Sequence, residues 1–156
     1  MKLLRVGEIG KEKPAALDKT GKTRDLSQHI VDFNPSTLNF ETLEKLKKVN
    51  LESLPEVPSS VRIGSCIAKP GKFLAIGLNY SDHAAETNSE IPKEPIIFNK
   101  AANCMVGPND NIILPKLSKK LDWEVEIAFV VGKNTKYINE KDAPNYILGY
   151  CMVNDI

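Results

Sequence analysis

The chain has 156 residues, of which 26% are charged and 42% hydrophobic, and its 21 basic and 20 acidic side chains give a formal net charge of +1. No apolar stretch reaches the roughly 18 residues of a membrane span, and the first ten residues lack the apolar core of a secretory signal. The near-neutral balance, without a clustered basic face, argues against a nucleic-acid partner. We therefore expect a cytoplasmic protein that binds neither nucleic acid nor membrane.

The first 60 residues predict a small α/β domain. Apolar runs at residues 3–6 and 14–17 predict short strands, and a polar cluster at 19–22 predicts a turn. Apolar positions at helical spacing predict a helix over residues 38–49, with Ser36 or Thr37 available as its cap. Two prolines within residues 54–60 predict a linker, so we place a domain boundary near residue 60.

The remainder, residues 61–156, is predicted to be rich in β-structure. Short helices are expected to begin at Ser81 and to cover residues 140–146. The fold class is therefore α+β. Three widely spaced cysteines show neither a zinc pattern nor a disulfide framework, so we expect buried free thiols in a reducing compartment. They are Cys66, Cys104 and Cys151. The predicted strands lie at residues 73–76, 96–98, 112–114, 123–131 and 146–153.

Two carboxylates occur at alternate positions of the strand predicted at 123–131. Side chains at i and i+2 share one face of a strand, so Glu124 and Glu126 should emerge side by side while Val125 and Ile127 face the other way. Such a pair suits a hard divalent cation such as Mg²⁺ or Mn²⁺, although two solvated glutamates on an edge strand are the simpler reading of the pattern alone. The apolar run that follows, residues 127–131, predicts a strand buried on both faces.

The segment after the strand at 73–76 carries a possible general base. His83 and Glu86 stand at i and i+3 of the helix predicted from Ser81, on one helical face. A carboxylate beside an imidazole fixes its tautomer and raises its basicity, which suits proton abstraction from water. An ordinary exposed His–Glu pair is the alternative. The final strand ends in Asn154 and Asp155, which offers a further carboxylate, although a turn is the commoner meaning of this pair.

Taken together, these segments resemble the fumarylacetoacetate hydrolase family. GLNYSDHAAE, EPIIFNKA, VGPND, DWEVEIAFVVGK and GYCMVNDI occur in the order and at about the spacing of that family. The first residues, MKLLRVGEIGKEKPA, and the later RDLS resemble its bacterial branch of ureidoglycolate lyases and 2,4-diketo-3-deoxy-sugar-acid hydrolases. The resemblance implies a small N-terminal domain over residues 1–60 and, over 61–156, the first part of a mixed catalytic β-roll.

The resemblance also implies roles for individual residues. Glu124, Glu126 and Asp155 match the family's three carboxylate ligands for Mg²⁺ or Mn²⁺. His83 and Glu86 match its water-activating pair. Substrate binding is implied for Tyr80 and Lys100, where a solvated surface lysine is an equal alternative for the latter. Members of the family are usually homodimers.

The implied reaction is hydrolysis of a carbon–carbon bond in a 2,4-dioxo acid, such as an acylpyruvate, with release of pyruvate. Isomerisation or decarboxylation of a 2-oxo dicarboxylic acid, or lyase action on ureidoglycolate, would share the same metal-held enolate and remain open. A third reading is a catalytically incomplete fragment. It rests on the later family segments, which do not follow Ile156, and on the position of Asp155 at a chain end that is expected to fray.

Overall fold

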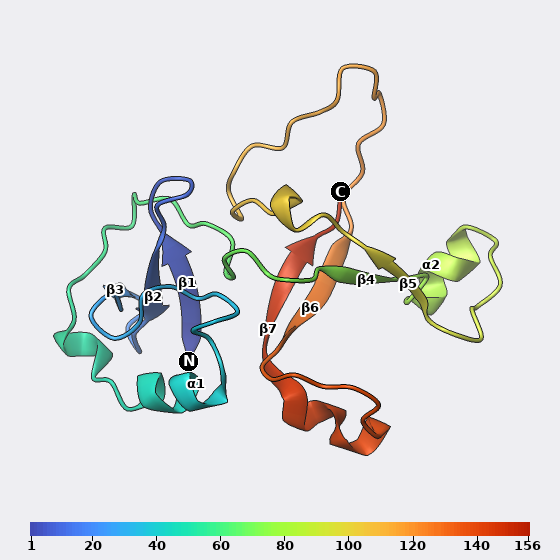
Figure 1. Cartoon of the computed structure of the whole chain (residues 1–156). Helices are drawn as coiled ribbons and strands as arrows, with labels where there is room; N and C mark the ends of the chain where they lie inside the picture. Colours follow the sequence, from blue (N-terminus) through green and yellow to red (C-terminus); the bar gives the residue numbers. More distant parts are fainter. The chain divides into compact units, whose positions relative to one another are not determined.

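The computed structural model describes all 156 residues, which form two compact units (Figure 1). Unit 1 comprises Met1–Ala68 together with Val106–Ile156, and unit 2 is the intervening segment Lys69–Met105. The strands pair into three antiparallel sheets, accompanied by short helices. The predicted α+β class is therefore confirmed. No helix is both long enough and apolar enough to span a bilayer. The domain boundary at residue 60 stays a prediction.

A three-stranded sheet opens unit 1, with the strands β1 (Lys2–Val6), β2 (Lys13–Leu17) and β3 (Thr23–Asp25) in sequential order. The first two confirm the predicted strands. The turn between β2 and β3 is organised by the Asp18 carboxylate, whose Oδ1 accepts hydrogen bonds from the backbone N–H of Thr20 at 2.8 Å and of Lys22 at 3.0 Å. Gly21 supplies the left-handed conformation that this turn needs, with φ of +84°.

Helix α1 (Phe40–Lys47) confirms the helix predicted over residues 38–49. Its N-cap is Asn39, whose side-chain oxygen accepts a hydrogen bond from Thr42 N at 2.9 Å. The predicted caps were wrong because both hydroxyls already have partners before the helix begins. Ser36 Oγ donates to the Asn34 side chain, and Thr37 Oγ1 donates to the backbone carbonyl of Asp32.

The core of the N-terminal sheet region gathers around the loop that precedes α1. Leu26 and Phe33, both on this loop, are fully buried, and Leu46 of α1 closes over them. Burying one such side chain contributes about 1.5–3 kcal/mol. The core residues are Ala16, Leu26, Ile30, Phe33 and Leu46.

The segment predicted to be a linker lies packed against β3. It follows the short 3₁₀ helix η1 (Leu51–Ser53). Val57 N donates to Thr23 O at 2.9 Å, and Asp25 N donates to Pro55 O at 3.0 Å. Two prolines therefore mark an extended edge segment here and not a free linker, because proline also suits strand edges, where no donor is needed.

Partly buried ion pairs connect the loop that begins at Gly107 to Arg62, and Arg62 in turn to Glu12. Arg62 makes two hydrogen bonds to Asp110, at 2.7 Å from Nε and 2.6 Å from Nη2, and Asp110 Oδ2 also accepts from Gly107 N at 2.6 Å. Glu12 accepts from both Arg62 and Arg5. Every charge in this network therefore has an opposite partner, which a partly buried guanidinium requires.

Strands β6 (Val125–Val131) and β7 (Ile147–Asn154) form an antiparallel ribbon, and the 3₁₀ helix η3 (Glu140–Tyr146) precedes β7. Both strands and the short helix confirm the predicted elements. The register sets Val125 opposite Asn154 and Ala128 opposite Cys151.

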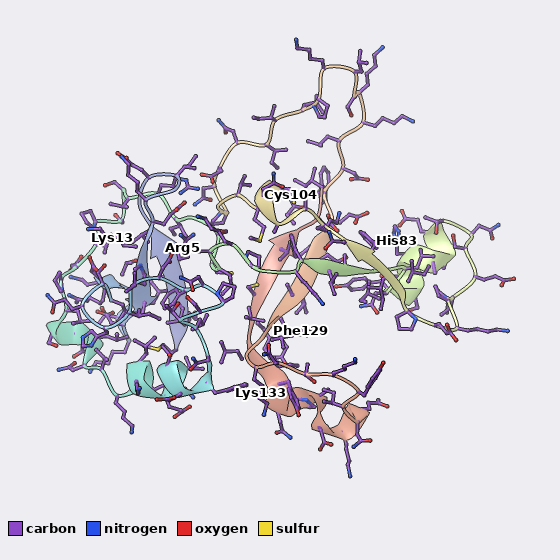
Figure 2. The ribbon with its side chains drawn as sticks, in the orientation of Figure 1. Arg5, Lys13, His83, Cys104, Phe129 and Lys133 are labelled. Carbon is purple, nitrogen blue, oxygen red and sulfur yellow. The ribbon has the colours of Figure 1, made fainter.

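Burial along β6 alternates, which corrects the expectation of a strand buried on both faces. Ile127 is 71% exposed and Phe129 57% exposed, and Met152, opposite Ile127, is 77% exposed. Figure 2 shows Phe129 on this ribbon. The even-numbered residues Ala128 and Val130 are only partly exposed. The apolar run thus has packing partners on one face of the ribbon in this chain.

Unit 2 contains a second ribbon, β4 (Leu74–Gly77) with β5 (Ile96–Asn99), and the helix α2 (Ser81–Glu86) between them. These match the predicted elements: α2 begins at Ser81, as predicted, and Tyr80 takes the N-cap position without a side-chain hydrogen bond. The 3₁₀ helix η2 (Ala102–Cys104) follows β5.

Two further sequence expectations were wrong. Residues 112–114 form no strand, because no other segment pairs with them. The cysteines are not buried: Cys104 is exposed, and Cys66 and Cys151 are partly exposed. All three are free thiols, as predicted.

Candidate functional site

Three carboxylate residues lie at one end of the β6–β7 ribbon. Asp155 N donates a hydrogen bond to Glu124 O at 2.8 Å, so these two residues extend the ladder just beyond the last strand pair. Glu126 pairs with Val153, one step further along. Because residues opposite each other in an antiparallel pair share a face, Glu124, Glu126 and Asp155 all belong to the even-numbered face of β6.

The side chains of these residues differ in exposure, and they are not gathered. Glu124 is exposed, whereas Glu126 and Asp155 are partly exposed. Nowhere in the chain do three His, Cys, Asp or Glu side chains lie close enough together to hold a metal ion. The ribbon therefore aligns the three backbone positions, but the three carboxylates do not form a group that could hold a metal ion. As a donor set, three carboxylates suit a hard cation such as Mg²⁺ or Mn²⁺.

The possible base and its partner lie on α2 in unit 2. His83 and Glu86 stand one turn apart, and both are exposed; Figure 2 shows the His83 side chain on this helix. Neither a hydrogen bond nor an ion pair joins them. The backbone of His83 is fixed, since its carbonyl accepts hydrogen bonds from Thr87 N at 3.1 Å and Thr87 Oγ1 at 2.9 Å. The helix thus presents the imidazole to solvent from a defined backbone position.

Of the two predicted substrate-binding residues, one lies beside this helix and the other does not. Tyr80 caps α2 and is 41% exposed. Lys100 follows β5, where its backbone N donates to Phe73 O at 2.8 Å and its ammonium lies 5.2 Å from the centre of the Phe98 ring. Because β4 runs from beside Lys100 toward α2, the lysine lies at the opposite end of the ribbon from Tyr80.

Sequence reasoning missed the polar group that closes the end of the carboxylate-bearing ribbon. The Asn154 side chain accepts a hydrogen bond from Glu124 N at 3.0 Å, and so fixes the backbone next to both Glu124 and Asp155. The Asn-Asp pair at the end of the last predicted strand was the available signal. Its meaning depended on the register of β7 against β6, which is not a local property of the sequence.

Comparison with known proteins assigns the family. A family model described as "Fumarylacetoacetate (FAA) hydrolase C-terminal" matches residues 72–156, more than half of the chain. A protein named as a hydrolase from Burkholderia ambifaria (strain MC40-6) is 47% identical over 156 residues, which cover 100% of this chain and 55% of the relative. The chain therefore spans about half the length of the curated relatives it matches.

Solved structures agree with this assignment. A fumarylacetoacetate hydrolase from the psychrophilic Exiguobacterium antarcticum is 25% identical, with a TM-score of 0.76 over 99% of this chain and 55% of that one. A protein from Mycobacterium abscessus is 26% identical, with a TM-score of 0.68 over the same shares of the two chains. The matched family model, the similar hydrolases and the shared fold agree, and the chain belongs to the fumarylacetoacetate hydrolase family.

Proposed function

We propose that the protein acts as a metal-dependent hydrolase that breaks a carbon–carbon bond in a 2,4-dioxo acid and releases pyruvate. The observation that carries this proposal is the register of β6 and β7, which sets Glu124 opposite Asp155 and puts Glu126 on the same face. Membership of the family supports a hydrolase. The substrate, the metal and the roles of single residues are our inference.

The three carboxylates of unit 1 would hold Mg²⁺ or Mn²⁺. When bound, such an ion supplies Lewis-acid stabilisation for negative charge that develops on the 2-oxo oxygen of a substrate. Glu124, Glu126 and Asp155 offer only oxygen donors, which these hard cations prefer over nitrogen or sulfur. The hydrogen bond from Glu124 N to Asn154 would keep the first and third of them in register.

Residues of unit 2 would handle the proton and the substrate. His83 would take a proton from the attacking water, and Glu86, at i+3, would stabilise the imidazolium that results. Tyr80 and Lys100 would bind polar groups of the substrate. The Lys100 ammonium already lies over the Phe98 ring, which limits its range of positions.

The chemistry balances with water as the only other reactant. The oxygen of water adds to the carbonyl distal to the acid group, and the carbon–carbon bond breaks with its electron pair retained by the leaving fragment. That fragment departs as the enolate of pyruvate and is then protonated at carbon. The products are pyruvate and a carboxylic acid, so no redox cofactor is required.

The test is a set of acylpyruvates assayed for pyruvate release, with added Mg²⁺ or Mn²⁺ and after removal of metal by a chelator. We expect Glu124→Gln and Asp155→Asn to weaken metal binding measured by calorimetry. His83→Ala should leave metal binding intact and lower the hydrolysis rate by a factor of roughly 10²–10⁴. Glu140→Gln, an exposed acid outside the ribbon, is the matched control for lost charge. Normal hydrolysis by His83→Ala, or unchanged metal affinity in Glu124→Gln, would contradict the assignment.

A further inference from the structure

A cleft of about 420 Å³ opens at the N-terminal sheet. It is lined by the end of β1, the turn that follows, parts of β2 and β3, and the segment 55–61. None of its lining residues belongs to β6, β7 or unit 2. The cleft therefore shares no residue with the proposed hydrolytic site, and its volume is in the range of sites that hold a small molecule.

Backbone hydrogen bonds hold both walls of the cleft in place. On one side, Gly7 N donates to Arg62 O at 2.9 Å, and on the other, Val57 N donates to Thr23 O at 2.9 Å. Val6, which is 6% exposed, is the most buried of the lining residues. Because the walls are fixed and the base is apolar, a ligand would enter a site that is already formed, which lowers the entropic cost of binding.

Five charged side chains line the cleft, and three of them already have ion pairs. The Lys11 ammonium lies 3.1 Å from the Glu8 carboxylate, and the Glu56 carboxylate lies 2.8 Å from the ammonium of Lys22. The two charged side chains that are left, one ammonium and one carboxylate, form no ion pair with each other or with any other residue. The cleft thus offers one unpaired charge of each sign.

These two unpaired side chains are Lys13 of β2 and Asp25 of β3 (Figure 2 shows Lys13). Lys13 is opposite Val6, and Asp25 is opposite Ala15, so all of these residues share one face of the sheet. Lys13 and Asp25 are then diagonal neighbours, which lie about 7–8 Å apart. Asp25 Oδ1 accepts a hydrogen bond from Ser27 N at 2.7 Å, whereas its other oxygen accepts none.

We propose that this cleft binds an aliphatic α-amino acid. The carboxylate of the ligand accepts hydrogen bonds from the Lys13 ammonium, its own ammonium donates to the second oxygen of Asp25, and its side chain lies against Val6 and Val57. Both charged groups of an α-amino acid are attached to one carbon, so the ligand fits between two side chains that are too far apart to pair directly. A simple anion or a metal cation would satisfy only one of the two. The proposal is independent of the hydrolase function.

The experiment is a saturation-transfer NMR titration of the whole chain with L-leucine. We expect saturable transfer to the leucine methyl protons. Two analogues each lack one charged group: 4-methylpentanoate has no ammonium, and 3-methylbutylamine has no carboxylate. Each should bind roughly tenfold more weakly, or worse, than L-leucine. Lys13→Gln and Asp25→Asn keep the side-chain size and should weaken L-leucine binding by a similar factor. Lys2→Gln, an exposed lysine of the same sheet outside the cleft, is the matched control and should bind as the unaltered chain does.

Each contrary outcome overturns the proposal. Absence of transfer at millimolar L-leucine would show that the cleft holds no such ligand. Equal affinity for L-leucine and both analogues would show that only apolar contact is involved. Unchanged affinity in Lys13→Gln and Asp25→Asn would show that the amino acid binds elsewhere. Circular dichroism checks that each variant is folded, and the analogue comparison, which uses the unaltered chain, decides the question even if a variant is not.

Discussion

Gly107 offers a sharp test of how the chain is held together, because a single methyl group there has no space. A Cβ built on Gly107 would lie 2.1 Å from Ile63 O, 3.0 Å from Asp110 Oδ2 and 3.1 Å from Gly64 Cα. Ordinary contacts of a Cβ begin at 3.4 Å. Gly107→Ala therefore forces a backbone shift of more than about 1 Å, well beyond ordinary relaxation of a packed region.

The structure also indicates which of the two contacting segments must move, the one around Ile63 or the loop that begins at Gly107. The segment around Ile63 is pinned to β1, since Gly7 N donates to Arg62 O at 2.9 Å and Gly64 N donates to Arg5 O at 2.8 Å. The loop that begins at Gly107 must then yield, and it would lose the hydrogen bond from Gly107 N to Asp110. Overpacking and one lost hydrogen bond together correspond to about 2–4 kcal/mol of unfolding free energy.

Urea unfolding followed by circular dichroism measures this loss. With a slope of about 1.5 kcal/mol per molar urea, the midpoint should fall by roughly 1.3–2.7 M in Gly107→Ala. Gly149→Ala is the matched control: it lies in β7 of the same unit, with no atom within 4 Å of the added Cβ. Its midpoint should stay unchanged or rise slightly. Equal midpoints for the two variants would refute the packing argument.

Two further predictions concern the N-cap and the ion pair. Asn39→Ala should cost about 1 kcal/mol of stability in the same urea experiment because it removes the cap of α1, whereas Ser36→Ala should cost less; the reverse order would contradict the cap assignment. Arg62 hydrogen bonds lower the pKa of Asp110 below its usual 3.8, so this carboxylate stabilises the fold above about pH 4 and stops doing so as acid protonates it. Asp110→Asn should flatten the acid-side fall of Tm, and an unchanged pH profile would show that the pair is not coupled to folding.

Local patterns in the sequence correctly predicted the features that depend on neighbouring residues. Period-two alternation placed Glu124 and Glu126 on one face of a strand, and helical spacing predicted α1 to within two residues at each end. The strand predicted at residues 112–114 is absent because its formation depends on more than the local sequence. Three apolar residues have the composition of a strand, but strand formation requires a partner to pair with, and the chain supplies none.

Features that depend on distant residues have no local signal in the sequence, and the grouping of Asp155 with Glu124 and Glu126 came from the family resemblance alone. The position of Asp155 opposite Glu124 follows from the β6–β7 register, which no local pattern near either residue encodes. The ladder geometry of the ribbon decides this position.

The register of β6 against β7 places the acidic side chains and the exposed apolar side chains on opposite faces of the ribbon. The carboxylates of Glu124 and Glu126 lie on the even-numbered face, which also carries Cys151 opposite Ala128. The exposed apolar side chains, Ile127 and Phe129 among them, occupy the other face. Because alternate side chains of a strand cannot change faces without a shift of register, a partner that covered the exposed apolar face would not contact the carboxylates. A continuous apolar run next to acidic residues is thus compatible with a polar site, provided that the acidic residues stand at alternate positions and so share one face of the strand.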